Sequence, residues 1–192
     1  VLGDTVVLTT ASKRVVAYSL DGVRRWSFTT PDLTMSAPVM ADGLVVVHDL
    51  GGQLTALDAH DGTVKWRAST TTDADVTPAV AGNVLLATDR SGNRSAIDIA
   101  TGRRLWSRSG EPAVAVASHG SQFVVFDDSG NVTSYGLDGT ERWTLHTDET
   151  DGRLSFAGDT ALVFGSAKVV AIGDDGKVVS TTPFGVDAAP SG

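Results

Sequence analysis

The side chains best suited to chemistry are four histidines and several aspartates. The histidines are His48, His60, His119 and His146. A zinc site needs ligands that converge at about 2.0–2.1 Å, but the four histidines fall at four different places in the pattern described below. Residues 127–131 (DDSGN) offer calcium-type oxygen ligands, yet they lack the spacing and the closing Glu of an EF-hand loop. We therefore expect no metal site and interpret residues 127–131 as a hairpin turn.

Catalytic motifs are also missing from the sequence. The chain has no cysteine, which excludes disulfides, thiolate metal ligands and cysteine nucleophiles. No G-x-S-x-G elbow, P-loop or G-x-G-x-x-G fingerprint occurs. The net charge of −8 argues against nucleic acid, which is bound by basic faces. We expect no catalytic residue, no cofactor-binding residue and no cofactor.

One eleven-residue stretch, residues 56–66 (ALDAHDGTVKW), combines an Asp, a His and a Trp, and the chain repeats it. Its copies are residues 17–26 (AYSLDGVRRW), 96–106 (AIDIATGRRLW), 134–143 (SYGLDGTERW) and 171–180 (AIGDDGKVVS). The four tryptophans, at positions 26, 66, 106 and 143, are 40, 40 and 37 residues apart. A period near 40 indicates a repeat architecture. We therefore interpret the stretch as a structural element of the repeat rather than as a functional site.

The repeat divides one domain, residues 1–192, into units 1–31, 32–72, 73–110, 111–148 and 149–185, with a tail at 186–192. Each unit offers four short strands separated by hairpin-turn residues; in the second unit we predict strands at 37–40, 44–48, 53–58 and 64–69. The second strand of each unit is a continuous apolar run, which predicts that it is covered on both faces. No helical period is present. The sequence therefore predicts an all-β protein, a β-propeller or part of one, built from about five four-stranded antiparallel blades.

The repeated residue types have a physical reason. Gly supplies the positive φ that a tight turn needs, and Asp accepts a backbone N–H within the turn. The small Ala56 and Ala96 leave room for a large neighbour, and tryptophan offers about 150–250 Å² of surface to fill it. We expect each Trp to dock between adjacent blades rather than to line a ligand groove.

The skeleton A-x-D-x-x-T-G-x-x-x-W resembles the tryptophan-docking motif of the PQQ-like (quinoprotein-like) β-propeller repeats. Thr101, Gly102 and Trp106 match it fully, and residues 36–39 and 76–79 resemble the first strand of that repeat. A WD-type repeat has a similar period, but its Trp-Asp signature is absent. Ser180 replaces the last Trp, as in a terminal unit.

The resemblance implies two classes of function. Dehydrogenases of the family hold pyrroloquinoline quinone and Ca²⁺ on much longer chains, and no cofactor residue of theirs can be matched here. Other members are non-enzymatic envelope proteins, including a lipoprotein of the outer-membrane barrel-assembly machinery, and sensor-like propellers on membrane kinases. The chain resembles this second class more closely. We expect a non-catalytic, protein-binding scaffold of the bacterial cell envelope; a ligand-sensing ectodomain and a dehydrogenase fragment remain alternatives.

The same reasoning yields expectations for location, partner and completeness. No apolar stretch is long enough to span a membrane, and the resemblance implies an extracytoplasmic location, with anchoring through a segment before Val1 left open. A protein partner is expected at the blade-connecting loops, residues 28–35, 69–76, 107–113 and 147–154. The acidic segments 70–75 and 147–151 suggest a basic partner. The chain is either an excerpt of a larger propeller or a five-bladed ring closed by its tail.

Overall fold

The computed structural model describes residues 3–70 and 76–184, all of it β-structure and connecting turns. The strands form five antiparallel sheets in sequence order, which we number as blades 1 to 5. Blade 1 comprises β1 (Thr5–Thr10), β2 (Arg14–Ser19) and β3 (Arg24–Thr29). Blade 2 comprises β4 (Val39–Ala41), β5 (Leu44–His48), β6 (Gln53–Asp58) and β7 (Val64–Ser69). The all-β, blade-by-blade architecture predicted from the repeat is confirmed.

The remaining blades follow the same plan. Blade 3 comprises β8 (Ala79–Ala81), β9 (Val84–Thr88), β10 (Asn93–Asp98) and β11 (Arg104–Ser109). Blade 4 comprises β12 (Ala113–His119), β13 (Gln122–Asp127), β14 (Asn131–Gly136) and β15 (Glu141–His146). Blade 5 comprises β16 (Arg153–Ala157), β17 (Thr160–Phe164), β18 (Lys168–Ile172) and β19 (Val178–Pro183).

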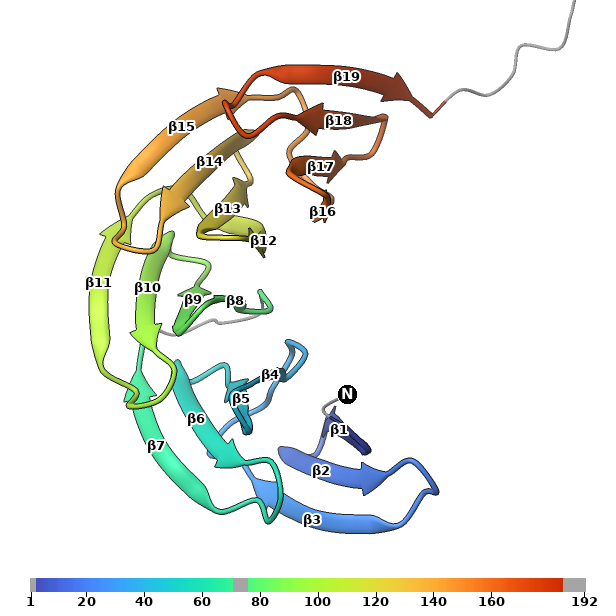
Figure 1. Cartoon of the computed structure of the whole chain (residues 1–192), viewed down its shortest axis with the longest axis vertical. Helices are drawn as coiled ribbons and strands as arrows, with labels where there is room; N and C mark the ends of the chain where they lie inside the picture. The colour runs from blue at the N-terminus through green and yellow to red at the C-terminus, as the bar shows by residue number, and fades with distance from the viewer. Residues whose placement is uncertain (1–2, 71–75, 185–192) are drawn as a thin grey trace, which may run out of the picture.

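The blades stand side by side along an arc, with the last strand of each blade at the outer rim (Figure 1). The arc is open: blades 1 and 5 lie at its two ends and no sheet joins them. The described residues thus form no closed five-bladed ring, and residues 186–192, the predicted tail, lie outside them. Blade 1 has three described strands, whereas each of the other blades has four.

Two first strands begin later than the sequence suggested. We predicted first strands at 37–40 and 78–80 in the second and third units, whereas β4 begins at Val39 and β8 begins at Ala79. Pro38 and Pro78 stand directly before these strands, and proline has no N–H to donate to a ladder. Proline therefore sets the start of each strand.

The core lies between blades, in four clusters of buried apolar side chains. The second strands of the inner blades, β5, β9 and β13, are buried along nearly their whole length, as predicted. In the end blades the prediction is wrong, because Leu8 of β1 is 51% exposed and Phe164 of β17 is 37% exposed. Within the described part of the chain, each of these strands has a neighbouring blade on one side only.

Candidate interaction surface

The repeated stretch forms the joint between blades. Each indole donates a hydrogen bond from Nε1 to a carbonyl in the third turn of the next blade. The pairs are Trp26 with Ala59 (3.0 Å), Trp66 with Ile99 (2.8 Å), Trp106 with Leu137 (2.7 Å) and Trp143 with Asp174 (2.9 Å). This confirms docking between blades and removes the tryptophans from the list of candidate ligand-binding residues.

In the four turns that receive an indole, glycine is required both by the backbone conformation and by the lack of space for a side chain. Gly102 has a φ of +72°, which side chains resist. A Cβ atom on Gly102 would lie 2.7 Å from the ring of Trp66, and one on Gly62 would lie equally close to Trp26. The ring thus packs directly on the turn backbone. Inside its own blade Trp66 is paired in register with Ala56, which is fully buried.

The aspartates of the stretch support its turns. Asp58 accepts the backbone N–H of His60 at 2.8 Å, and Asp98 accepts that of Thr101 at 2.9 Å. Lys65 also pairs with Asp58, at 2.9 Å between Nζ and Oδ2. The Lys65 ammonium holds the pKa of Asp58 below its usual value, and Asp58 in turn raises the pKa of Lys65. The predicted turn chemistry is confirmed.

The four histidines lie in four different environments. His48 is buried, and its Nε2 lies 2.7 Å from Oγ1 of Thr70. His60 is exposed in the β6–β7 turn. His119 pairs with Asp159 at 2.9 Å, and His146 Nδ1 lies 3.2 Å from the Asn131 amide oxygen. Among residues 3–70 and 76–184 no three His, Asp or Glu side chains are grouped as metal ligands.

His48 makes stability depend on pH. Burial lowers its pKa from the ordinary 6.5 to about 4, because the charged imidazole loses its hydration. As the pH falls, His48 takes up a proton in the unfolded chain before it does so in the folded protein. The free energy of unfolding is therefore highest above pH 6.5, falls between pH 6.5 and pH 4, and is constant below that as far as His48 is concerned. We expect a total loss of about 3 kcal/mol. Urea unfolding at several pH values measures it. Blade 3 has a threonine, Thr88, at the position of His48, so His48→Thr is a conservative replacement. In this variant the loss of stability between pH 6.5 and pH 4 should disappear. An unchanged pH dependence would show that His48 is not its source.

The acidic loop at 147–151 is not a free acidic surface. Glu149 is 4% exposed, and its Oε2 accepts the backbone N–H groups of Ser166 at 2.7 Å and Ala167 at 3.4 Å. Asp148 pairs with Lys168 at 3.1 Å. The guess of a basic partner at this loop is therefore not supported, because two of its carboxylates are already engaged. Of the related acidic segment, residues 71–75 lie outside the described part of the chain.

Glu149 takes the role of an aspartate that blades 2 to 4 carry in the turn between their second and third strands. Asp49, Asp89 and Asp127 each accept backbone N–H groups of their own turn. Blade 5 has Gly165 at this position, and a Cβ there would lie 2.0 Å from Glu149 Oε2. The missing side chain makes room for a carboxylate supplied by the preceding loop.

Removing this carboxylate should destabilise blade 5. We expect Glu149→Ala to lower the free energy of unfolding by about 1.5–3 kcal/mol, the range for hydrogen bonds to a charged group. Gly165→Asp alone should also destabilise, because its side chain collides with Glu149. The double variant should recover most of the loss, since Asp then serves the turn as in blades 2 to 4. Thermal and urea unfolding measure the stability of the three variants. A double variant no more stable than Glu149→Ala would show that the Glu149 carboxylate does not stand in for the missing aspartate.

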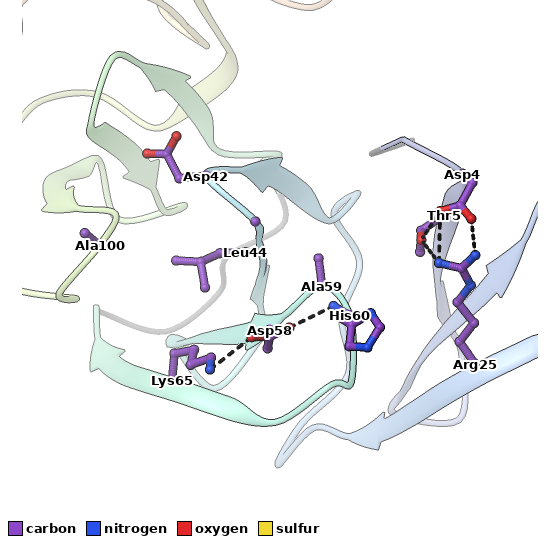
Figure 2. A pocket seen from close by; sticks show the side chains of 11 residues that line it. Asp4, Thr5, Arg25, Asp42, Leu44, Asp58, Ala59, His60, Lys65 and Ala100 are labelled. Atoms are coloured by element: carbon purple, nitrogen blue, oxygen red, sulfur yellow. Dashed lines mark hydrogen bonds and ion pairs between the residues drawn. The ribbon is translucent and has the colours of Figure 1, made fainter.

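A shallow hollow of about 640 Å³ lies at the other end of the strands, where the turns of blades 1, 2 and 3 meet (Figure 2). Its charged lining residues are Asp4, Arg25, Asp42, Asp58 and Lys65, beside His60. Asp42 sits at the tip of the β4–β5 turn with a φ of +51°, a conformation that Asp tolerates better than most residues. The hollow draws on residues more than 90 positions apart, from Asp4 to Ala100, and no sequence pattern signalled it.

The charges around the hollow largely neutralise one another. Arg25 donates to Asp4 at 2.9 Å and to Thr5 at 2.8 Å, and Lys65 pairs with Asp58 as described above. The Arg25 guanidinium holds the pKa of Asp4 below its usual value. Ion pairs this exposed contribute little to stability. The hollow is thus an open surface on which two of the carboxylates, Asp4 and Asp58, are each paired with a cation.

Comparison with known proteins identifies the family of the chain and solved structures with the same fold. The sequence model of a family described as outer membrane protein assembly factor BamB matches residues 1–124. No curated protein matches the sequence. Many solved structures share the fold, among them three that are each under 20% identical to this chain. None of the described residues forms a helix able to cross a membrane.

The structure of BamB from Moraxella catarrhalis is 18% identical, with a TM-score of 0.77 over 95% of this chain and 60% of that one. The structure of dihydro-heme d1 dehydrogenase NirN in complex with DHE is 18% identical, with a TM-score of 0.79 over 93% of this chain and 43% of that one. The structure of a europium-containing methanol dehydrogenase is 16% identical, with a TM-score of 0.81 over 96% of this chain and 50% of that one. The chain therefore spans about half the length of these proteins. Because the family model covers well over half of the chain, the protein belongs to the BamB family of PQQ-like β-propeller repeats.

Proposed function

We propose that this chain is a non-catalytic scaffold that binds a protein partner outside the cytoplasm, in the bacterial cell envelope. The observation that carries the proposal is the open hollow formed by turns of three successive blades. Its open shape and paired charges suit the surface of another protein better than a small substrate, which is bound in a more enclosed cleft. The description of the matching family as an outer-membrane assembly factor supports the envelope location.

Site-specific photo-crosslinking tests this proposal. A photoreactive residue is placed at Asp42 or His60, both at the hollow, and at Asp128, which lies in the β13–β14 turn at the opposite end of the strands. In cells of the source organism, the first two positions should give one discrete protein adduct that the third does not give. Adducts at none of the positions, or the same adducts at all three, would contradict the proposal.

A companion variant separates binding from folding. Asp42→Ala combined with His60→Ala should reduce recovery of the crosslinked partner from a third position at the hollow, Ala100. Both side chains are exposed in turns, and only the positive φ of residue 42 disfavours alanine, so the free energy of unfolding should fall by no more than about 1–2 kcal/mol. Undiminished adduct formation in the folded double variant would mean that the partner binds elsewhere.

The enzymatic alternative fits the described residues poorly. A dehydrogenase of this fold family that uses pyrroloquinoline quinone also needs carboxylate ligands for Ca²⁺, and residues 3–70 and 76–184 hold no group of three acidic or histidine side chains placed for a metal. We derive no reaction step from them. Titration with the quinone and Ca²⁺, followed by absorbance, should show no binding; saturable binding with turnover of an alcohol would favour the enzyme instead.

A further inference from the structure

One residue of the hollow departs from the repeat. In blades 2 to 5 the turn between the first and second strands is two residues long, and its first residue has a positive φ. In blades 3, 4 and 5 this residue is glycine (Gly82, Gly120 and Gly158), with φ between +55° and +59°. In blade 2 it is Asp42, with a φ of +51°. Among these four blades only blade 2 carries a side chain at the tip of this turn, in a conformation that side chains disfavour.

The carboxylate of Asp42 does not support its own turn. Other turn aspartates do so: Asp61 and Asp138 each accept the backbone N–H of the residue two positions on, at 2.9 Å and 3.0 Å. Within the described part of the chain, the Asp42 carboxylate accepts no hydrogen bond and forms no ion pair. The usual reason for an aspartate in a tight turn, which is a local hydrogen bond to the backbone, is therefore absent at this position.

The charge of Asp42 is also uncompensated within the hollow. Asp4 is paired with Arg25, and Asp58 is paired with Lys65. Figure 2 shows the Asp42 side chain turned away from both of these cations. The hollow therefore offers a surface whose other two carboxylates are neutralised and whose remaining carboxylate is open to a cation from outside the chain.

We propose, on the basis of the function proposed above, that the protein partner of the hollow presents a lysine or arginine side chain to Asp42. The charged end of that side chain would bind the carboxylate. Its apolar stem would pack on Leu44 and Ala100, which line the hollow and are partly and fully exposed. A basic contact residue on the partner explains why a carboxylate stands at a turn position where the other blades have glycine.

The test keeps the photoreactive residue at Ala100 and changes the charge of Asp42. Asp42→Asn removes the charge but keeps nearly the same shape, and asparagine tolerates a positive φ as aspartate does. Asp128→Asn is the matched control, because it changes the net charge of the chain by the same amount in the β13–β14 turn, at the opposite end of the strands. The yield of the partner adduct is compared in cells of the source organism at equal amounts of each variant.

Asp42→Asn should lower the adduct yield about two- to fivefold, the range for loss of an exposed ion pair. Asp42→Lys should lower it by about tenfold or more, because two cations would then face each other. Asp128→Asn should give the yield of the parent. An undiminished yield in Asp42→Asn would overturn the basic contact and leave the proposed function intact. No discrete adduct in any variant, the parent included, would overturn both proposals.

Two further measurements separate recognition from folding. Denaturant midpoints of Asp42→Asn and Asp42→Gly should stay close to that of the parent, because the carboxylate makes no contact in its turn and both replacements tolerate the positive φ. Clearly lower midpoints in both variants would make the carboxylate a structural group and overturn the proposal. Mass spectrometry of the adduct should place a lysine or arginine of the partner beside the crosslinked residue. A crosslinked segment without a basic residue would contradict the proposal.

Discussion

Trp66→Ala is expected to lower the free energy of unfolding by about 3–5 kcal/mol, the range for removing a large aromatic from a core. The indole is 9% exposed, packs on Gly102 and donates to the Ile99 carbonyl. Its removal opens a cavity between blades 2 and 3 and leaves that buried carbonyl without its partner. Urea unfolding followed by circular dichroism measures the change.

Trp143→Ala is the matched control, because the same contact is made in a more exposed setting. Trp143 also donates to a carbonyl and packs on a glycine, but it is only partly buried. We expect a smaller loss than for Trp66→Ala, because less apolar surface leaves water when this joint forms. Equal losses would contradict this dependence on burial, and a Trp66→Ala variant as stable as the parent would show that the indole does not hold the blades together.

Gly102→Ala is expected to have the second large effect, about 2–5 kcal/mol in total. Its φ of +72° costs a side chain about 1–2 kcal/mol. The new methyl would also lie 2.7 Å from the Trp66 ring, and overpacking of this kind costs about 1–3 kcal/mol more. The substitution therefore pushes the joint apart as well as straining the turn.

Gly22→Ala isolates the conformational part of that effect. Gly22 has a similar φ of +85°, but its Cβ would meet no atom within 4 Å. We expect a loss of only about 1–2 kcal/mol, the cost of the left-handed conformation alone. Denaturant midpoints of the two variants give the comparison. A Gly22→Ala variant as unstable as Gly102→Ala would mean that the ring contact at Gly102 contributes nothing.

The periodic part of the structure could be predicted from the sequence. Turn glycines and apolar runs are local signals, and they placed β5, β6 and β7 at their observed bounds. The fixed spacing from Gly to Trp predicted the interblade joint, because one physical contact recurs at one register. Where a local rule was overlooked, as with the proline before β4, the predicted strand began two residues too early.

What does not repeat was harder to predict. Glu149 looked like part of an acidic surface, because nothing in its own segment reveals that Gly165 has no side chain to serve its turn. The apolar run at Leu8 predicted a covered strand, and only the arrangement of blades shows that one face has no neighbour. The hollow beside His60 combines turns from three units, and single-sequence patterns do not report distances between turns.

The account rests on the claim that the repeated stretch is a joint between blades, and a double-mutant cycle on Trp66 and Gly102 tests it most directly. Free energies of unfolding are measured for the parent, both single variants and the double alanine variant. Once Trp66 is alanine, Gly102→Ala should cost only about 1–2 kcal/mol, as at Gly22, because only the turn conformation remains strained. The two losses should therefore add to more than the loss in the double variant. Strictly additive losses would contradict the joint.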